Sequence, residues 1–155
     1  MKKFIFIALL TLSYTMSFGQ NFSELAKTEF KSKESYKPAE TQVLTCANYL
    51  FNTPANQAEP NRLNAVQYII KWMSGTPDYT FDLGEKAMNL TGENSDLLGL
   101  YMAAMSKVVL ENSTQKLSSD EIYSQSEKIV VKYCAVADNK IKPSKKIKQL
   151  IKEIE

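Results

Sequence analysis

The chain has 155 residues, contains no histidine, and carries a formal charge of +2 from 19 basic and 17 acidic side chains. The absence of histidine excludes Ser-His-Asp and Cys-His catalysis and the common zinc sites that use an imidazole ligand. Two cysteines cannot form a cysteine-only zinc site, and no glycine-rich nucleotide-binding motif occurs, so we expect no metal and no cofactor. The near-neutral charge also disfavours nucleic acid as a partner.

The first 19 residues have the pattern of an export signal. Lys2 and Lys3 precede the apolar run FIFIALLTL, and small residues before Gln20 fit a signal-peptidase site. The run is shorter than the about 20 residues that a membrane-spanning helix needs. We therefore expect cleavage near Gly19-Gln20 and a periplasmic or secreted protein without a membrane span.

In residues 20–38 a short helical stripe, Phe22, Leu25, Ala26 and Phe30, is interrupted by KSKESYKP, which predicts a flexible lead-in with at most one helical turn. A helical pattern starts after Pro38 and ends before Thr53, with Cys46 on its apolar face. The apolar residues of that face are Val43, Leu44, Ala47, Leu50 and Phe51. From residue 39 to residue 155 we expect a single helical domain.

A second helix is predicted from Pro60 to Met73, because proline suits a first helical turn and apolar residues recur at helical spacing. The residues expected to face the core are Leu63, Val66, Ile70 and Met73. Gly75 follows the last periodic residue, where a left-handed helix terminus is favourable for glycine.

Two further helices are predicted in the middle of the chain. A capping box of Asp82 and Glu85 begins a short helix that Gly92 closes. Ser95 then opens the segment DLLGLYMAAMSKVVL, which is apolar almost all the way round. That distribution indicates a helix enclosed by other helices.

The last two predicted helices begin at serines. Ser118 and Glu121 form a capping-box pattern ahead of a helix that carries Cys134 on its inner face. Ser144 can cap a tail helix with isoleucine and leucine on one face and lysine on the other. We expect this helix to dock on the bundle; the alternative is that its basic face touches anionic lipid or an acidic protein.

The fold class predicted by these elements is all-α, a compact bundle of five or six helices. Cys46 and Cys134 are the only cysteines, and in an oxidising compartment two such thiols favour a disulfide. The alternative is that both are small, unlinked, buried residues.

The stretch KWMSGTPDYTF, residues 71–81, supplies the candidate partner surface: Trp72, Asp78, Tyr79 and Phe81. Loops often carry binding residues, and these aromatics surround a Gly-Pro turn. The competing interpretation is a helix end followed by a turn, with aromatics folded over the edge of the core.

Two other residue groups were weighed as sites. The carboxylates Asp78, Asp82 and Glu85, or the pair Glu93 and Asp96, could serve a hydrolase, although acids are also favoured near helix starts. The methionines could form an adaptable apolar surface or simply fill the core. These methionines are Met73, Met88, Met102 and Met105.

Because the sequence shows no recognisable set of catalytic residues, we expect a non-enzymatic protein that binds another protein. It would act as an inhibitor, an immunity factor or a chaperone-like factor. One alternative is a carrier of an apolar small molecule, held between the enclosed helix and its methionine-rich neighbours. The other is a carboxylate-dependent hydrolase of cell-wall sugars.

Overall fold

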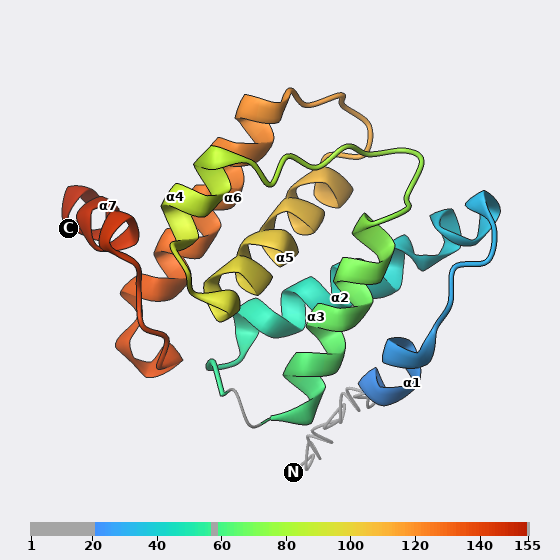
Figure 1. The fold of residues 1–155 in the computed structure, drawn as a ribbon, viewed down its shortest axis with the longest axis horizontal. Helices are drawn as coiled ribbons and strands as arrows, with labels where there is room; N and C mark the ends of the chain where they lie inside the picture. The colour runs from blue at the N-terminus through green and yellow to red at the C-terminus, as the bar shows by residue number, and fades with distance from the viewer. Residues whose placement is uncertain (1–20, 57–58, 155) are drawn as a thin grey trace, which may run out of the picture.

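The computed structural model describes residues 21–56 and 59–154, which form seven α-helices and three short 3-10 helices with no strand among them (Figure 1). The α-helices are α1 (Phe22–Lys27), α2 (Glu40–Asn52), α3 (Pro60–Met73), α4 (Glu85–Thr91), α5 (Ser95–Glu111), α6 (Ser119–Ala135) and α7 (Lys145–Ile154). The 3-10 helices are η1 (Lys33–Ser35), η2 (Lys37–Ala39) and η3 (Ala137–Asn139). The predicted all-α class is confirmed, and the predicted number of five or six helices is wrong.

The central helix is α5, as its apolar composition predicted. Leu100, Met105 and Leu110 point to different sides of this helix, and all three are buried. α2 and α3 pack against one side of α5, and α4 and α6 pack against the other (Figure 1). A helix with neighbours on both sides has no polar face to keep in water, which is why its sequence lacks the usual amphipathic stripe.

The additional helix is α1, in the segment that was expected to be a flexible lead-in. Phe22 of α1 is buried, and its ring centroid lies 4.5 Å from that of Tyr49 on α2. The Lys71 ammonium on α3 donates to the carbonyl of Ala26 at 2.6 Å. A six-residue helix has little stability alone, so these tertiary contacts account for a helix where the sequence predicted at most one turn in a flexible segment.

Two of the three predicted serine or aspartate caps are confirmed. Ser118 and Glu121 form the expected capping box of α6. Ser144 accepts a hydrogen bond from the Ile147 amide at 3.1 Å, at the start of α7. The predicted box at Asp82 is wrong, because its carboxylate accepts from the Gly84 amide at 2.8 Å and α4 begins with no side-chain cap.

Gly75 ends α3 for a different reason from the one predicted. Among the described glycines only Gly92 has a positive φ, at 62°, where it terminates α4. A side-chain carbon added at Gly75 would instead lie 2.0 Å from the hydroxyl oxygen of Tyr36. Close approach of the lead-in segment therefore requires glycine at this position.

The predicted disulfide between Cys46 and Cys134 is wrong. Both cysteines are free and buried, Cys46 on α2 and Cys134 on α6. α5 packs against both of these helices and stands between them, so the inward-facing thiols contact different parts of the core (Figure 1). A disulfide requires the two Cα atoms to be less than about 7 Å apart.

The predicted export signal, residues 1–19, lies outside the described residues. Within the described part of the chain, no helix combines the length and the apolar character needed to cross a membrane.

Candidate functional site

An open apolar groove runs between α3 and the first half of α5. Its volume is about 310 Å³. We call it the α3–α5 groove. Its main apolar residues are Leu63, Val66 and Ile70 of α3, Gly99 and Met102 of α5, and Ile141 of the segment before α7.

The groove exists because α3 is apolar on two faces. The residues that α3 buries in the core are Ala65, Tyr68, Ile69 and Trp72. The face predicted to be buried is the other one, and on it Leu63 is 54% exposed and Ile70 is 37% exposed. The predicted core orientation of α3 is therefore wrong. Of the four apolar residues that motivated it, Leu63, Val66 and Ile70 line the groove, and Met73 packs against the core.

Gly99 sets the depth of the α3–α5 groove. A side-chain carbon at this position would lie 3.3 Å from Cγ1 of Val66, closer than is usual for carbon contacts. The glycine thus lets α3 and α5 approach closely beneath the groove, which leaves Val66 and Met102 half-buried along its length. An alanine here would push against Val66.

Arg62 lies at the base of the groove, and its guanidinium is already bound. It donates to the carbonyl of Leu50 at 3.1 Å, and to the carbonyl and hydroxyl of Thr53 at 3.1 and 2.8 Å. Arg62 is 8% exposed, so these bonds keep a buried cation paired with the end of α2. Through these bonds of Nη1, Arg62 holds the end of α2 beside the groove.

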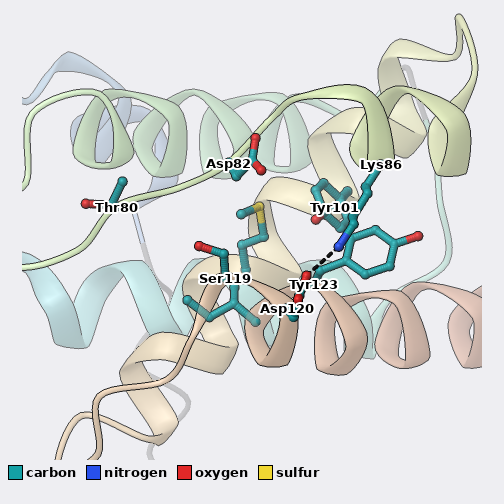
Figure 2. A pocket seen from close by; sticks show the side chains of 9 residues that line it. Thr80, Asp82, Lys86, Tyr101, Ser119, Asp120 and Tyr123 are labelled. Carbon is teal, nitrogen blue, oxygen red and sulfur yellow. Dashed lines mark hydrogen bonds and ion pairs between the residues drawn. The ribbon is translucent and has the colours of Figure 1, made fainter.

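The second candidate site is a polar hollow between α4 and α6, with a volume of about 20 Å³ (Figure 2). We call it the Lys86–Asp120 hollow, after the ion pair that spans it. The Lys86 ammonium also lies 5.5 Å from the centre of the Tyr123 ring. Asp120 raises the pKa of Lys86, and Lys86 lowers the pKa of Asp120.

Of the carboxylates predicted from the sequence, Asp82 lines the Lys86–Asp120 hollow. Figure 2 shows its carboxylate turned away from Asp120, which already forms an ion pair with Lys86. The two carboxylates therefore do not face a common point. Burial raises the pKa of Tyr101, which lines the hollow, to about 12, so this phenol stays protonated at neutral pH. A space of this size holds a water molecule and excludes a sugar ring.

The remaining predicted carboxylates do not converge. Asp78 lies in the turn after α3, Glu85 begins α4 and Glu93 follows it, and all three are exposed. Asp96 lines one end of the α3–α5 groove. Within residues 21–56 and 59–154 no group of three or more acidic or cysteine side chains is placed to hold a metal ion.

The candidate partner surface of aromatic residues divides into a buried and an exposed part. Trp72 has no exposed surface, and its indole N–H donates to the carbonyl of Tyr36 at 3.2 Å, so the placement of Trp72 on a surface is wrong. Tyr79 and Phe81 lie over it, with ring centroids 5.7 and 5.9 Å away, and both are half-buried. Asp78 and Tyr79 border a wide polar hollow beside the loop before α6.

The predicted methionines lie in three different environments, whereas both cysteines are buried in the core. Met105 is buried in the core, Met102 lines the α3–α5 groove, and Met88 is 50% exposed on α4. Burial raises the pKa of both thiols, Cys46 and Cys134, to about 12. A buried thiol that stays protonated is a poor nucleophile and a poor metal ligand.

Sequence reasoning did not identify the α3–α5 groove, although it named most of its apolar residues. The signal that could have found it is the coexistence of two apolar stripes on α3, because a helix at the edge of a bundle can bury only one face. No protein-family model, no curated protein and no solved structure matches this chain.

Proposed function

We propose that this protein acts without catalysis, by binding an amphipathic helix of another protein in the α3–α5 groove. The observation that carries the proposal is the exposure of Leu63 and Ile70 beside half-buried Val66 and Met102, on a helix whose opposite face is already buried. Contiguous exposed apolar side chains of this kind mark interaction surfaces.

A helix fits the groove better than an extended segment does. Leu63, Val66 and Ile70 recur at i, i+3 and i+7, so they form a ridge two turns long, and α5 supplies the second wall. A third helix can lay its own ridge between two packed helices, with apolar residues at the same spacing. The groove has no exposed strand edge to pair with an extended peptide in the described part of the chain.

The positive charge at one end of the groove indicates which end of the partner helix should be acidic. Lys140 and Lys142 flank Ile141, both are exposed, and neither belongs to an ion pair among the described residues. The Lys142 carbonyl accepts from the Asn94 side chain at 3.3 Å, which holds this segment against the start of α5. We therefore expect the partner helix to carry acidic residues near the end that meets Lys140 and Lys142.

The second candidate function is transport of an apolar small molecule in the same groove. Its volume of about 310 Å³ falls at the lower end of the range of about 300–1,000 Å³ for ligand pockets. The exposure of Leu63 and Ile70 favours a protein partner, since a carrier would enclose the side chains that contact its ligand.

Export remains part of the proposal. The charged start, the apolar run and the small residues before Gln20 support it. Mass analysis of protein secreted by a Gram-negative host should find a chain that begins at or near Gln20, and an intact N-terminus would contradict export.

The groove can be tested with a displayed library of three-turn helical peptides, selected against the purified protein. The selected peptides should carry apolar residues at i, i+3 or i+4, and i+7, with acids near one end. Leu63→Glu and Ile70→Glu should each weaken their binding at least about 10-fold, as loss of a central interface contact does.

Met88→Glu is the matched control, because Met88 is as exposed as Leu63 but lies on α4, outside the groove. Equal binding of the peptides to all three variants, or selection of peptides without the apolar spacing, would refute the proposed site. Uptake of a fatty acid that Leu63→Glu abolishes, with no peptide selected, would favour the carrier function instead.

A further inference from the structure

Arg62 is the only arginine in a chain with 19 basic residues. It is also the only charged side chain buried in the described part of the chain, at 8% exposure. Charged side chains are almost never buried unless an opposite charge or a set of hydrogen bonds compensates them. The groups around Arg62 therefore show what its charge still lacks.

No acid compensates the Arg62 guanidinium. The four ion pairs in residues 21–56 and 59–154 use other side chains. Its three hydrogen bonds go to the carbonyls of Leu50 and Thr53 and to the Thr53 hydroxyl, and Nη1 makes all three. These oxygens carry only partial negative charge. The nearby Tyr133 adds none, because burial raises the pKa of this phenol and keeps it neutral.

Glu59, the N-cap of α3, uses its carboxylate elsewhere. It accepts hydrogen bonds from the Tyr49 hydroxyl at 2.6 Å and from the amides of Asn61 and Arg62 at 3.2 and 3.1 Å. Asp96 of α5 lines the groove together with Arg62, but no ion pair joins the two. The positive charge of Arg62 is therefore hydrogen-bonded but not neutralised by the described residues.

One edge of the Arg62 guanidinium is left for a ligand. Nε and Nη2 form no hydrogen bond with the described part of the chain, and neither is among its fully buried, unpartnered polar atoms. They are therefore accessible, and the hollow that Arg62 lines is the α3–α5 groove. Nε and Nη2 form the side of a guanidinium that can hold a carboxylate through two parallel hydrogen bonds.

Lys140 supplies a second cation at the same end of the groove. Ala55 lines both the groove and an adjoining hollow of about 480 Å³, and Lys140 lines that hollow. The Ala55 amide donates to the carbonyl of Asn139 at 2.7 Å, which fixes the turn before Lys140 against the connection from α2 to α3. Asp138 precedes this turn but lines neither hollow.

We propose that an acidic side chain of the partner helix places its carboxylate on the Nε–Nη2 edge of Arg62, with Lys140 beside it at the surface. This inference rests on the proposed function and names the residue that recognises the partner's acid. Arg62 is already desolvated, so a carboxylate that reaches it neutralises a buried cation and gains more than it would at an exposed lysine. The groove thus selects a helix with an apolar stripe and an acid at one end of that stripe.

The test compares two versions of a helical peptide selected against the groove, one with glutamate at its acidic end and one with glutamine there, both with acetylated and amidated termini. The glutamine version should bind the protein at least about 10-fold more weakly, as expected for loss of a hydrogen bond between charged groups. Because Arg62 is the only arginine, the protein has a single guanidinium Nε–H signal in its NMR spectrum. The glutamate version should shift this signal, and the glutamine version should shift it much less.

Substitutions in the protein separate the two cations. Arg62→Gln should bind both peptides with the same affinity, and circular dichroism checks its fold; the comparison of peptides on the parent protein does not depend on this variant. Lys140→Gln should weaken binding of the glutamate version several-fold, and 0.5 M NaCl should remove that difference, because salt screens an exposed pair. Lys132→Gln, at an exposed position on α6 outside the groove, is the matched control and should bind like the parent.

Equal affinity of the two peptides for the parent protein, with an unmoved Nε–H signal, would overturn this inference. The groove itself would stand in that case if Leu63→Glu still weakened both peptides, whereas the proposed function would fail if Leu63→Glu weakened neither. A shift of the Nε–H signal by decanoate, and by no selected peptide, would overturn the assignment of the carboxylate to a partner helix.

Discussion

The two apolar faces of α3 have similar residue chemistry and opposite surroundings. Tyr68, Ile69 and Trp72 face the core and are buried, whereas Leu63 and Ile70 face the α3–α5 groove and are exposed. The difference comes from the neighbours: α1, α2 and the lead-in segment cover the first face, whereas the second contacts α5 through Val66 and leaves Leu63 and Ile70 exposed. An uncovered apolar face costs solubility, so its persistence is explained most simply by a partner.

The largest expected effect is on the core face. Trp72→Ala should lower the free energy of unfolding by about 3–5 kcal/mol, because it removes a fully buried indole, its contacts with Tyr79 and Phe81, and its hydrogen bond to Tyr36. Urea unfolding followed by circular dichroism measures this directly. A loss below about 1 kcal/mol would mean that Trp72 is not packed as described.

Arg62 should show an intermediate effect, because it supports the boundary between the two faces. Arg62→Leu leaves the buried carbonyl of Leu50 without its donor and should cost about 1–3 kcal/mol by urea unfolding. Lys128→Leu, at an exposed position on α6, is the control and should stay within about 0.5 kcal/mol of the parent. Equal effects of the two substitutions would contradict the burial of Arg62.

Alkaline pH tests the core face without mutation. Burial raises the pKa of Tyr68 on α3 and of Cys46 beside it to about 12, from ordinary values of 10.0 and 9.0. Above pH 9 the unfolded chain releases these protons first while the folded chain retains them. These two groups should therefore leave the free energy of unfolding unchanged between pH 7 and 8 and lower it as the pH rises from 9 to 12.

The expected slope is about 1.4 kcal/mol per pH unit for each group that is ionised only in the unfolded chain. Urea midpoints at pH 7, 9 and 10.5 measure it. In the double variant Cys46→Ala and Cys134→Ala, the free energy of unfolding should no longer fall from pH 9, where the thiols ionise in the unfolded chain. It should still fall from about pH 10, where the tyrosines do. A midpoint unchanged between pH 7 and 10.5 would contradict the burial of these groups.

The smallest effect on stability is expected on the groove face. Leu63→Ser and Ile70→Ser should each change the free energy of unfolding by no more than about 0.5 kcal/mol, since both side chains are already in contact with water. They should nevertheless weaken the binding of a selected helical peptide. A destabilisation comparable to that of Trp72→Ala would show that the groove is closed by the chain itself.

The comparison also explains what the sequence could predict. Composition and periodicity were sufficient for the all-α class, for the enclosed position of α5, and for the caps at Ser118 and Ser144, because these depend on residues close together in the chain. The orientation of α3 was not predictable in the same way. Both of its faces satisfy helical spacing, and only the positions of α1 and α2 decide which one is buried.

The predicted disulfide and the placement of Trp72 on the candidate partner surface were wrong for related reasons. Cys46 and Cys134 each lie on an inward face, but inward faces need not meet, and α5 separates these two. Trp72 lies in the last turn of α3, and its indole bonds to Tyr36, which comes from a segment with weak periodicity. Tertiary contacts between distant segments decide both outcomes.

The most direct test of the groove is methyl NMR of the protein titrated with a helical peptide selected against it. The methyl signals of Leu63, Val66, Ile70 and Met102 should shift on binding, while those of Met88 and Ile154, which are exposed elsewhere, should stay unchanged. Shifts confined to Ile154, or to residues beside Tyr79 and Phe81, would contradict the assignment of the partner to the α3–α5 groove.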